Sequence, residues 1–155
     1  MPGGLRQTIN QIWQERDVVA VRPPQAYTVA VGAYTIFSVA GGAILVKALI
    51  GRITGAAVGA TTIATTFNTI AGEAGAVACN GAVGTLVVVP LNVAAVIVNL
   101  LAAPLTDALL HPKGMVVGLQ PAGPGLIVAT YGVGTSLTME WTLVYQRLNA
   151  DANVT

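Results

Sequence analysis

Apolar and polar positions alternate along residues 137–146, near the C-terminal end of the chain. Five large apolar side chains occupy every second position of this segment: Leu137, Met139, Trp141, Leu143 and Tyr145. The positions between them are mostly polar. A period of two residues is typical of a β-strand that buries one of its faces. We therefore predict a strand here, with Trp141 and Tyr145 in the core of the domain.

Other segments of the chain predict further strands. Residues 27–32 alternate in the same way, and residues 43–50 form a continuous, mostly apolar run bounded by glycine at both ends. Asn80-Gly81 readily takes the backbone angles of a tight hairpin turn. Glycine-containing turns recur along the rest of the chain. This spacing predicts an all-β fold, a small β-sandwich or barrel that resembles a jelly roll.

One uncharged run, "LVVVPLNVAAVIVNLL" at residues 86–101, has two interpretations. It is long enough to take part in a helix that crosses a membrane. However, Pro90, Asn92 and Asn99 each remove or burden a helical hydrogen bond in lipid, and no cluster of Lys or Arg flanks the run. We interpret it as two strands, the first ended by Pro90, with one face on the core and the other against a neighbouring subunit. A membrane-inserted protein remains an alternative.

The first 26 residues differ from the remainder of the chain. They carry five of its thirteen charged side chains, and four large apolar residues recur there at helical spacing: Leu5, Ile9, Ile12 and Trp13. This pattern predicts a short amphipathic helix that ends before Pro23-Pro24. We therefore divide the chain into an N-terminal arm of residues 1–26 and a β domain of residues 27–155. The arm residues are expected to dock on the domain or on a neighbour; a partly ordered tail fits the composition equally well.

Composition limits how the surface of this domain can be covered. Of its 155 residues 54% are hydrophobic and only 8% are charged, with a mean hydropathy of +0.73. An average soluble domain has about 25% charged residues. Much of the outer surface should therefore contact other protein or lipid. The net charge of +1 provides no basic surface for nucleic acid, so no nucleic-acid partner is expected.

Residues suited to catalysis or metal binding are sparse. The chain has one histidine, His111, which precedes Pro112 in a predicted turn, and one cysteine, Cys79. A single cysteine forms neither an intrachain disulfide nor a CxxC pair. Phosphate-binding loop motifs are also missing from the sequence. We predict no catalytic, cofactor-binding or metal site, and a protein that is not an enzyme.

Two stretches give the chain a resemblance to a known class of protein. "YTVAVGAYTIFSVAGGAILVKALIGRIT" (27–54) and the closing "MEWTLVYQRLNADANV" (139–154) resemble small all-β head proteins of tailed bacteriophages, of the capsid decoration or cement kind. The resemblance implies a structural virion protein on the outer surface of the capsid, where it binds the major capsid protein and stabilises contacts between capsomers. It also implies a homo-oligomer, a trimer or dimer, without active-site residues or a membrane partner. A component of the phage tail or fibre base is the alternative within the same composition.

Overall fold

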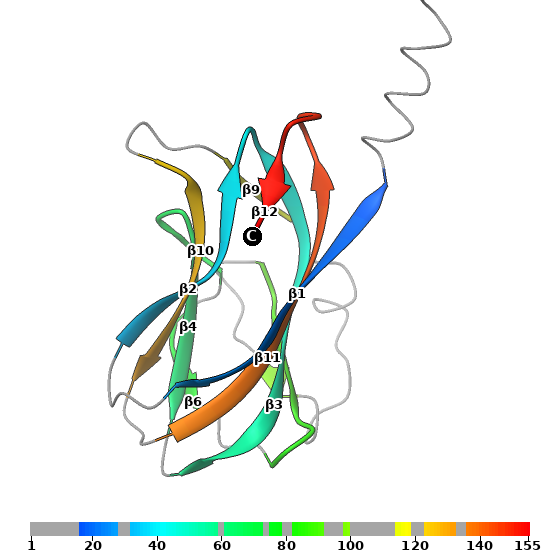
Figure 1. The fold of residues 1–155 in the computed structure, drawn as a ribbon. Helices are drawn as coiled ribbons and strands as arrows, with labels where there is room; N and C mark the ends of the chain where they lie inside the picture. The colour runs from blue at the N-terminus through cyan, green and yellow to red at the C-terminus, as the bar shows by residue number, and fades with distance from the viewer. Residues whose placement is uncertain are drawn as a thin grey trace, which may run out of the picture.

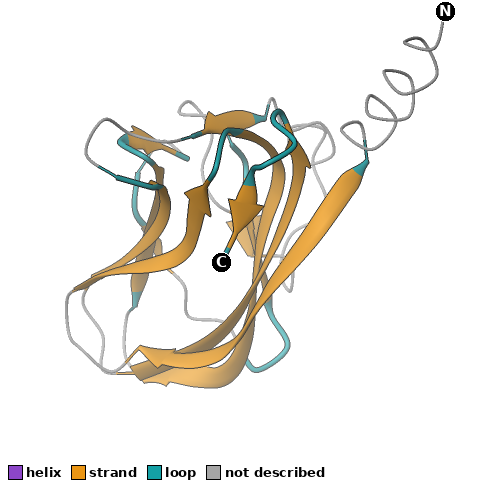
Figure 2. Cartoon of the chain, turned by 45° about the horizontal axis from the view of Figure 1, so that its top comes forward, coloured by secondary structure: helices purple, strands orange, loops and turns teal. Residues whose placement is uncertain are grey.

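The computed structural model describes residues 16–27, 32–58, 61–72, 75–78, 82–91, 98–99, 114–118, 123–132 and 136–155. Across these residues the protein consists of strands joined by loops (Figure 2). The strands pair into two antiparallel sheets of six strands each, which lie against one another (Figure 1). The predicted all-β sandwich is thus confirmed.

The two sheets have the following strands. The first sheet has the order β1 (Asp17–Tyr27), β11 (Ser136–Arg147), β3 (Ile44–Val58), β7 (Leu86–Val89) and β8 (Val98–Asn99), and β9 (Met115–Val117) also pairs with β3. The second sheet has the order β12 (Asn153–Val154), β2 (Gly32–Ala40), β10 (Gly125–Gly132), β4 (Thr62–Phe67) and β5 (Ile70–Ala71), and β6 (Val77–Ala78) also pairs with β4.

The order of the strands defines a jelly roll. The first four strands alternate between the two sheets, so the chain crosses from one sheet to the other between each of them. Early strands then pair with late ones: β1 with β11, β2 with β10, and β3 with β7. This nesting of strand pairs across two sheets is the arrangement of a jelly roll, which is built from two Greek keys. The predicted resemblance to a jelly roll therefore holds for the strand order as well as for the all-β class of the fold.

The core lies between the two sheets. Along β11 the alternate residues from Leu137 to Tyr145 are buried, and β10 alternates in the same way along its whole length. Trp141 and Tyr145 are 0% and 3% exposed. The side chains that the two sheets bury between them provide most of the apolar area whose burial drives folding.

A close approach between β3 and β11 explains the glycines of β3. A Cβ atom at Gly51 would meet the end of the Met139 side chain and would come within 3.1 Å of the Trp141 ring. One at Gly55 would lie 2.8 Å from Thr138 Oγ1. These glycines therefore serve strand packing in a sheet.

The N-terminal boundary of the β domain differs from the sequence-based division. Residues 17–26, which we assigned to the arm, form most of β1 and pair with β11. Pro23 and Pro24 lie at a bulge in this pairing, between Arg22 and Gln25. Proline is tolerated there because β1 is the edge of its sheet among the described strands, where no ladder bond is lost. The strand predicted over residues 27–32 falls mostly on residues 28–31, outside the described part of the chain.

The hairpin predicted around Asn80-Gly81 is wrong. These two residues lie outside the described ones, but the strands on either side of them belong to different sheets. β6 pairs with β4 in the second sheet, whereas β7 pairs with β3 in the first. The chain therefore crosses from the second sheet to the first between β6 and β7.

The uncharged run is consistent with strands where the structure describes it. β7 ends at Val89, directly before Pro90, and β8 pairs antiparallel with it. Within the described ranges, no helix is long and apolar enough to cross a membrane.

Candidate interaction surfaces

The described residues provide little chemistry for catalysis. No three of their His, Cys, Asp or Glu side chains are close enough together to hold a metal ion. His111 and Cys79 lie outside the described residues. Two features of the surface remain as candidate sites for binding: a groove between the edges of the two sheets, and the outer face of the first sheet.

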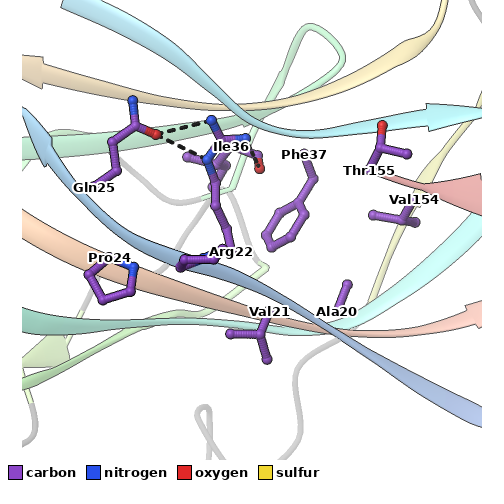
Figure 3. Close-up of a pocket in the computed structure, with 10 residues that line it drawn as sticks. Ala20, Val21, Arg22, Pro24, Gln25, Ile36, Phe37, Val154 and Thr155 are labelled. Atoms are coloured by element: carbon purple, nitrogen blue, oxygen red, sulfur yellow. Dashed lines mark hydrogen bonds between the residues drawn. The ribbon is translucent and has the colours of Figure 1, made fainter.

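The groove opens where the edge of the first sheet faces the edge of the second. β1 forms one wall, and β2 with the C-terminal residues forms the other (Figure 3). The groove has a volume of about 460 Å³. The walls are mainly apolar, with Ala20 and Pro24 on one side and Phe37 and Val154 on the other. Arg22 is the only cationic side chain among the described residues that line the groove.

Arg22 connects the two sheets across this groove. Its Nη1 donates a hydrogen bond of 3.1 Å to the main-chain oxygen of Ile36 on β2. Its Nε and Nη2 both donate to Oε1 of Gln25, at 3.1 and 3.0 Å, and these two bonds fix the orientation of the guanidinium (Figure 3). Gln25 orients the guanidinium, and the guanidinium satisfies a carbonyl at the edge of the second sheet. We assign this pair a role in positioning the two sheets.

An aromatic cluster lies at the end of β1. The Tyr27 ring stacks on that of Tyr131, with centroids 4.2 Å apart, and meets the Tyr34 ring edge to face at 4.9 Å. Burial raises the pKa of Tyr27 above its ordinary value. Tyr131 and Trp141 lie close enough to lower that pKa in part, but neither makes a well-formed hydrogen bond with the Tyr27 hydroxyl. Burial in the cluster therefore keeps Tyr27 protonated to a higher pH than an exposed tyrosine.

The outer face of the first sheet carries an uncharged band across four strands. Strand register places Val21, Thr142, Ile50 and Val88 in one row, and Val19, Val144 and Ala48 in the next. We call these seven residues the outer band. Val19 and Val21 are 59% and 55% exposed, which is high for valine, and the other five are half-buried.

An ion pair lies at each end of the outer band along the strands. Lys47 Nζ is 2.7 Å from Oδ1 of Asp17 at one end, and Arg52 Nη2 is 3.1 Å from Oε1 of Glu140 at the other. Each pair joins two strands of the first sheet. The charges at both ends of the band are thus neutralised within the protein itself, and the band between them is neutral.

Of the residues singled out in the sequence, those predicted for the core are described by the structure and those predicted for the interface are not. Leu5, Ile9, Ile12 and Trp13, the predicted interface residues of the arm, lie outside the described residues. Trp141 and Tyr145 are in the core, away from the surface. The outer band was not predicted from the sequence, although the unbroken apolar run at residues 18–21 carries part of its signal. The role of Arg22 was not predicted either, since only the tertiary fold brings Ile36 beside it.

Comparison with known proteins adds no family. No protein-family model, curated protein or solved structure matches the chain.

Proposed function

We propose that the protein is a structural virion component that binds the outside of a bacteriophage capsid, contacts the major capsid protein and stabilises the junctions between capsomers. It acts through surface contacts and carries out no reaction. Copies of the chain associate with one another as part of this role.

The outer band is the observation that carries the proposal. A sheet face with two strongly exposed valines, bordered by ion pairs that are already satisfied, is typical of a surface covered by protein in an assembly. A protein that works as a free monomer usually scatters its exposed apolar residues. The scarcity of charge along the whole chain agrees with extensive contacts.

The fold adds support by analogy. Jelly rolls are used by viral capsid proteins, but also by lectins and cupins, so the topology alone assigns no function. Together with the resemblance of residues 27–54 and 139–154 to phage head proteins, it favours a role in the capsid over one in the tail.

Binding to capsid shells tests the proposal. The purified protein is mixed with shells assembled from the major capsid protein of the same virus, and the pellet is quantified after sedimentation. We expect saturable binding at a fixed ratio of copies to capsomers, and an increase in the temperature at which the shells disrupt. An unrelated β-sandwich protein serves as the control for protein that is carried into the pellet without binding the shells. Absence of saturable binding by the folded protein would contradict the proposal.

A further inference from the structure

We infer that the outer band is a two-fold interface with a second copy of this chain. The inference rests on the proposed function, because it names the surface through which that structural subunit meets itself. It commits to one partner, an identical chain, and to one geometry, in which the outer faces of two first sheets pack against one another.

The shape of the band suits this packing. It belongs to the four adjacent strands β1, β11, β3 and β7, whose antiparallel register aligns its side chains in two rows. Six of its seven residues are aliphatic, and six, including Thr142, are β-branched. Rows of this kind interdigitate when two sheets stack about 10 Å apart with their strands nearly aligned. In a two-fold contact the two rows of one copy pack against the same two rows of the other copy.

Charge favours an identical copy over a charged partner. Asp17, Lys47, Arg52 and Glu140 sum to zero, and each is already paired within the chain. Among the four charged residues at the ends of the outer band, a strongly acidic or basic partner would find no free counter-charge. A second copy brings the same neutral band and the same satisfied pairs, so two faces meet without like-charge repulsion.

The available area is sufficient for a specific contact. The strands lie about 4.8 Å apart, and rows of outward-facing side chains lie about 6.8 Å apart along them. Four strands and four rows, namely the two rows of the outer band and one row of paired charges at each end, give a face of roughly 19 by 27 Å. Each partner would then cover about 500 Å², and the two together about 1,000 Å², which is the lower limit for a stable interface. The contact is therefore expected to be a modest one, strengthened when many copies assemble on one particle.

Two variants with a matched control test the inference. Val21→Glu and Thr142→Glu each place a carboxylate in the outer band, on β1 and β11. Ile70→Glu introduces the same group at a position that is 53% exposed but lies on β5 of the second sheet. Sedimentation-velocity analysis over a micromolar concentration series measures self-association, and circular dichroism confirms that each variant is folded.

We expect the full chain and Ile70→Glu to form the same dimer, and the two band variants to raise its dissociation constant by roughly tenfold or more. A wild-type protein that remains monomeric, a trimer, or a dimer that both folded band variants retain would overturn the inference. A dimer that is lost only when residues 1–15 are deleted would assign the contact to the arm and would also overturn it. Capsid co-sedimentation of the same samples separates the two ideas: a monomer that still saturates shells removes this interface and leaves the proposed function standing.

Discussion

The indole Nε1 of Trp141 donates a hydrogen bond of 3.2 Å to the hydroxyl oxygen of Tyr131, across the interior between the two sheets. Trp141 lies on β11 of the first sheet and Tyr131 on β10 of the second. The Tyr131 hydroxyl in turn is 3.8 Å from the sulfur of Met139. A polar link in a largely apolar core fixes how one sheet is positioned on the other.

The first prediction concerns this link. Trp141→Phe removes both the donor and part of the ring, and should lower the free energy of unfolding by about 2 to 4 kcal/mol. Tyr131→Phe leaves the buried indole N–H without its acceptor and should cost about 1 to 3 kcal/mol. Because both variants break the same bond, the double variant should cost less than their sum. Urea unfolding of the four proteins measures the coupling, and strict additivity would show that the bond contributes nothing.

A second prediction uses the pKa of Tyr27. Burial raises this pKa in the folded protein above the ordinary value of 10.0. Above about pH 10 the unfolded chain therefore loses this proton while the folded protein retains it, so the contribution of Tyr27 to stability decreases as the pH rises. At neutral pH, Tyr27→Phe should change stability by less than about 1 kcal/mol, since the hydroxyl makes no well-formed hydrogen bond.

The pH test compares the two proteins directly. The free energy of unfolding is measured for wild type and Tyr27→Phe from neutral pH to above pH 10. We expect the wild type to lose more stability than the variant over the alkaline part of this range. Parallel curves would show that Tyr27 has the same pKa in the folded and unfolded chains.

The third prediction compares two arginines. Arg22→Met breaks the half-buried bond to the Ile36 carbonyl and should lower the free energy of unfolding by about 1.5 to 3 kcal/mol. Arg52→Met breaks an ion pair whose arginine side chain is 54% exposed, and should cost less than about 1 kcal/mol. Denaturant unfolding of both variants gives the comparison. Equal costs would mean that Arg22 does not hold the two sheets together.

The sequence predicts the strands of this fold better than it predicts their connections. The alternation from Leu137 to Tyr145 identifies β11, because a sheet with one buried face requires that period. β1 was missed because Pro23-Pro24 argues against a strand unless the strand is known to be an edge with a bulge. The hairpin at Asn80-Gly81 was wrong because turn propensity is local, whereas the sheet that each flanking strand joins is decided by the whole topology.

The candidate surfaces depend even more on tertiary structure. Val21, Thr142, Ile50 and Val88 come from four separate segments, and only the strand register aligns them. Arg22 has an ordinary sequence context, and its role follows from the position of Ile36 on the opposite sheet.

A fourth prediction concerns the N-terminal arm. Deletion of residues 1–15 leaves β1 complete, because that strand begins at Asp17. The truncated protein should therefore keep its strand-dominated circular dichroism spectrum. It should also bind capsid shells roughly tenfold or more weakly, because four large apolar side chains are lost, each contributing about 1.5 to 3 kcal/mol before ordering costs. Trp13→Ala with Ile9→Ala should weaken binding in the same direction. Unchanged saturation of shells by the folded truncated protein would make the arm a passive tail.

A cryo-EM reconstruction of the virus particle that contains this protein tests the central claim most directly. We predict density on the outside of the head, at the junctions between capsomers, into which the two-sheet jelly roll fits with its strand order β1-β11-β3-β7 and β2-β10-β4. Density for the same fold in the tail or fibre base, or a complete head reconstruction in which every capsomer junction lacks it, would contradict the account.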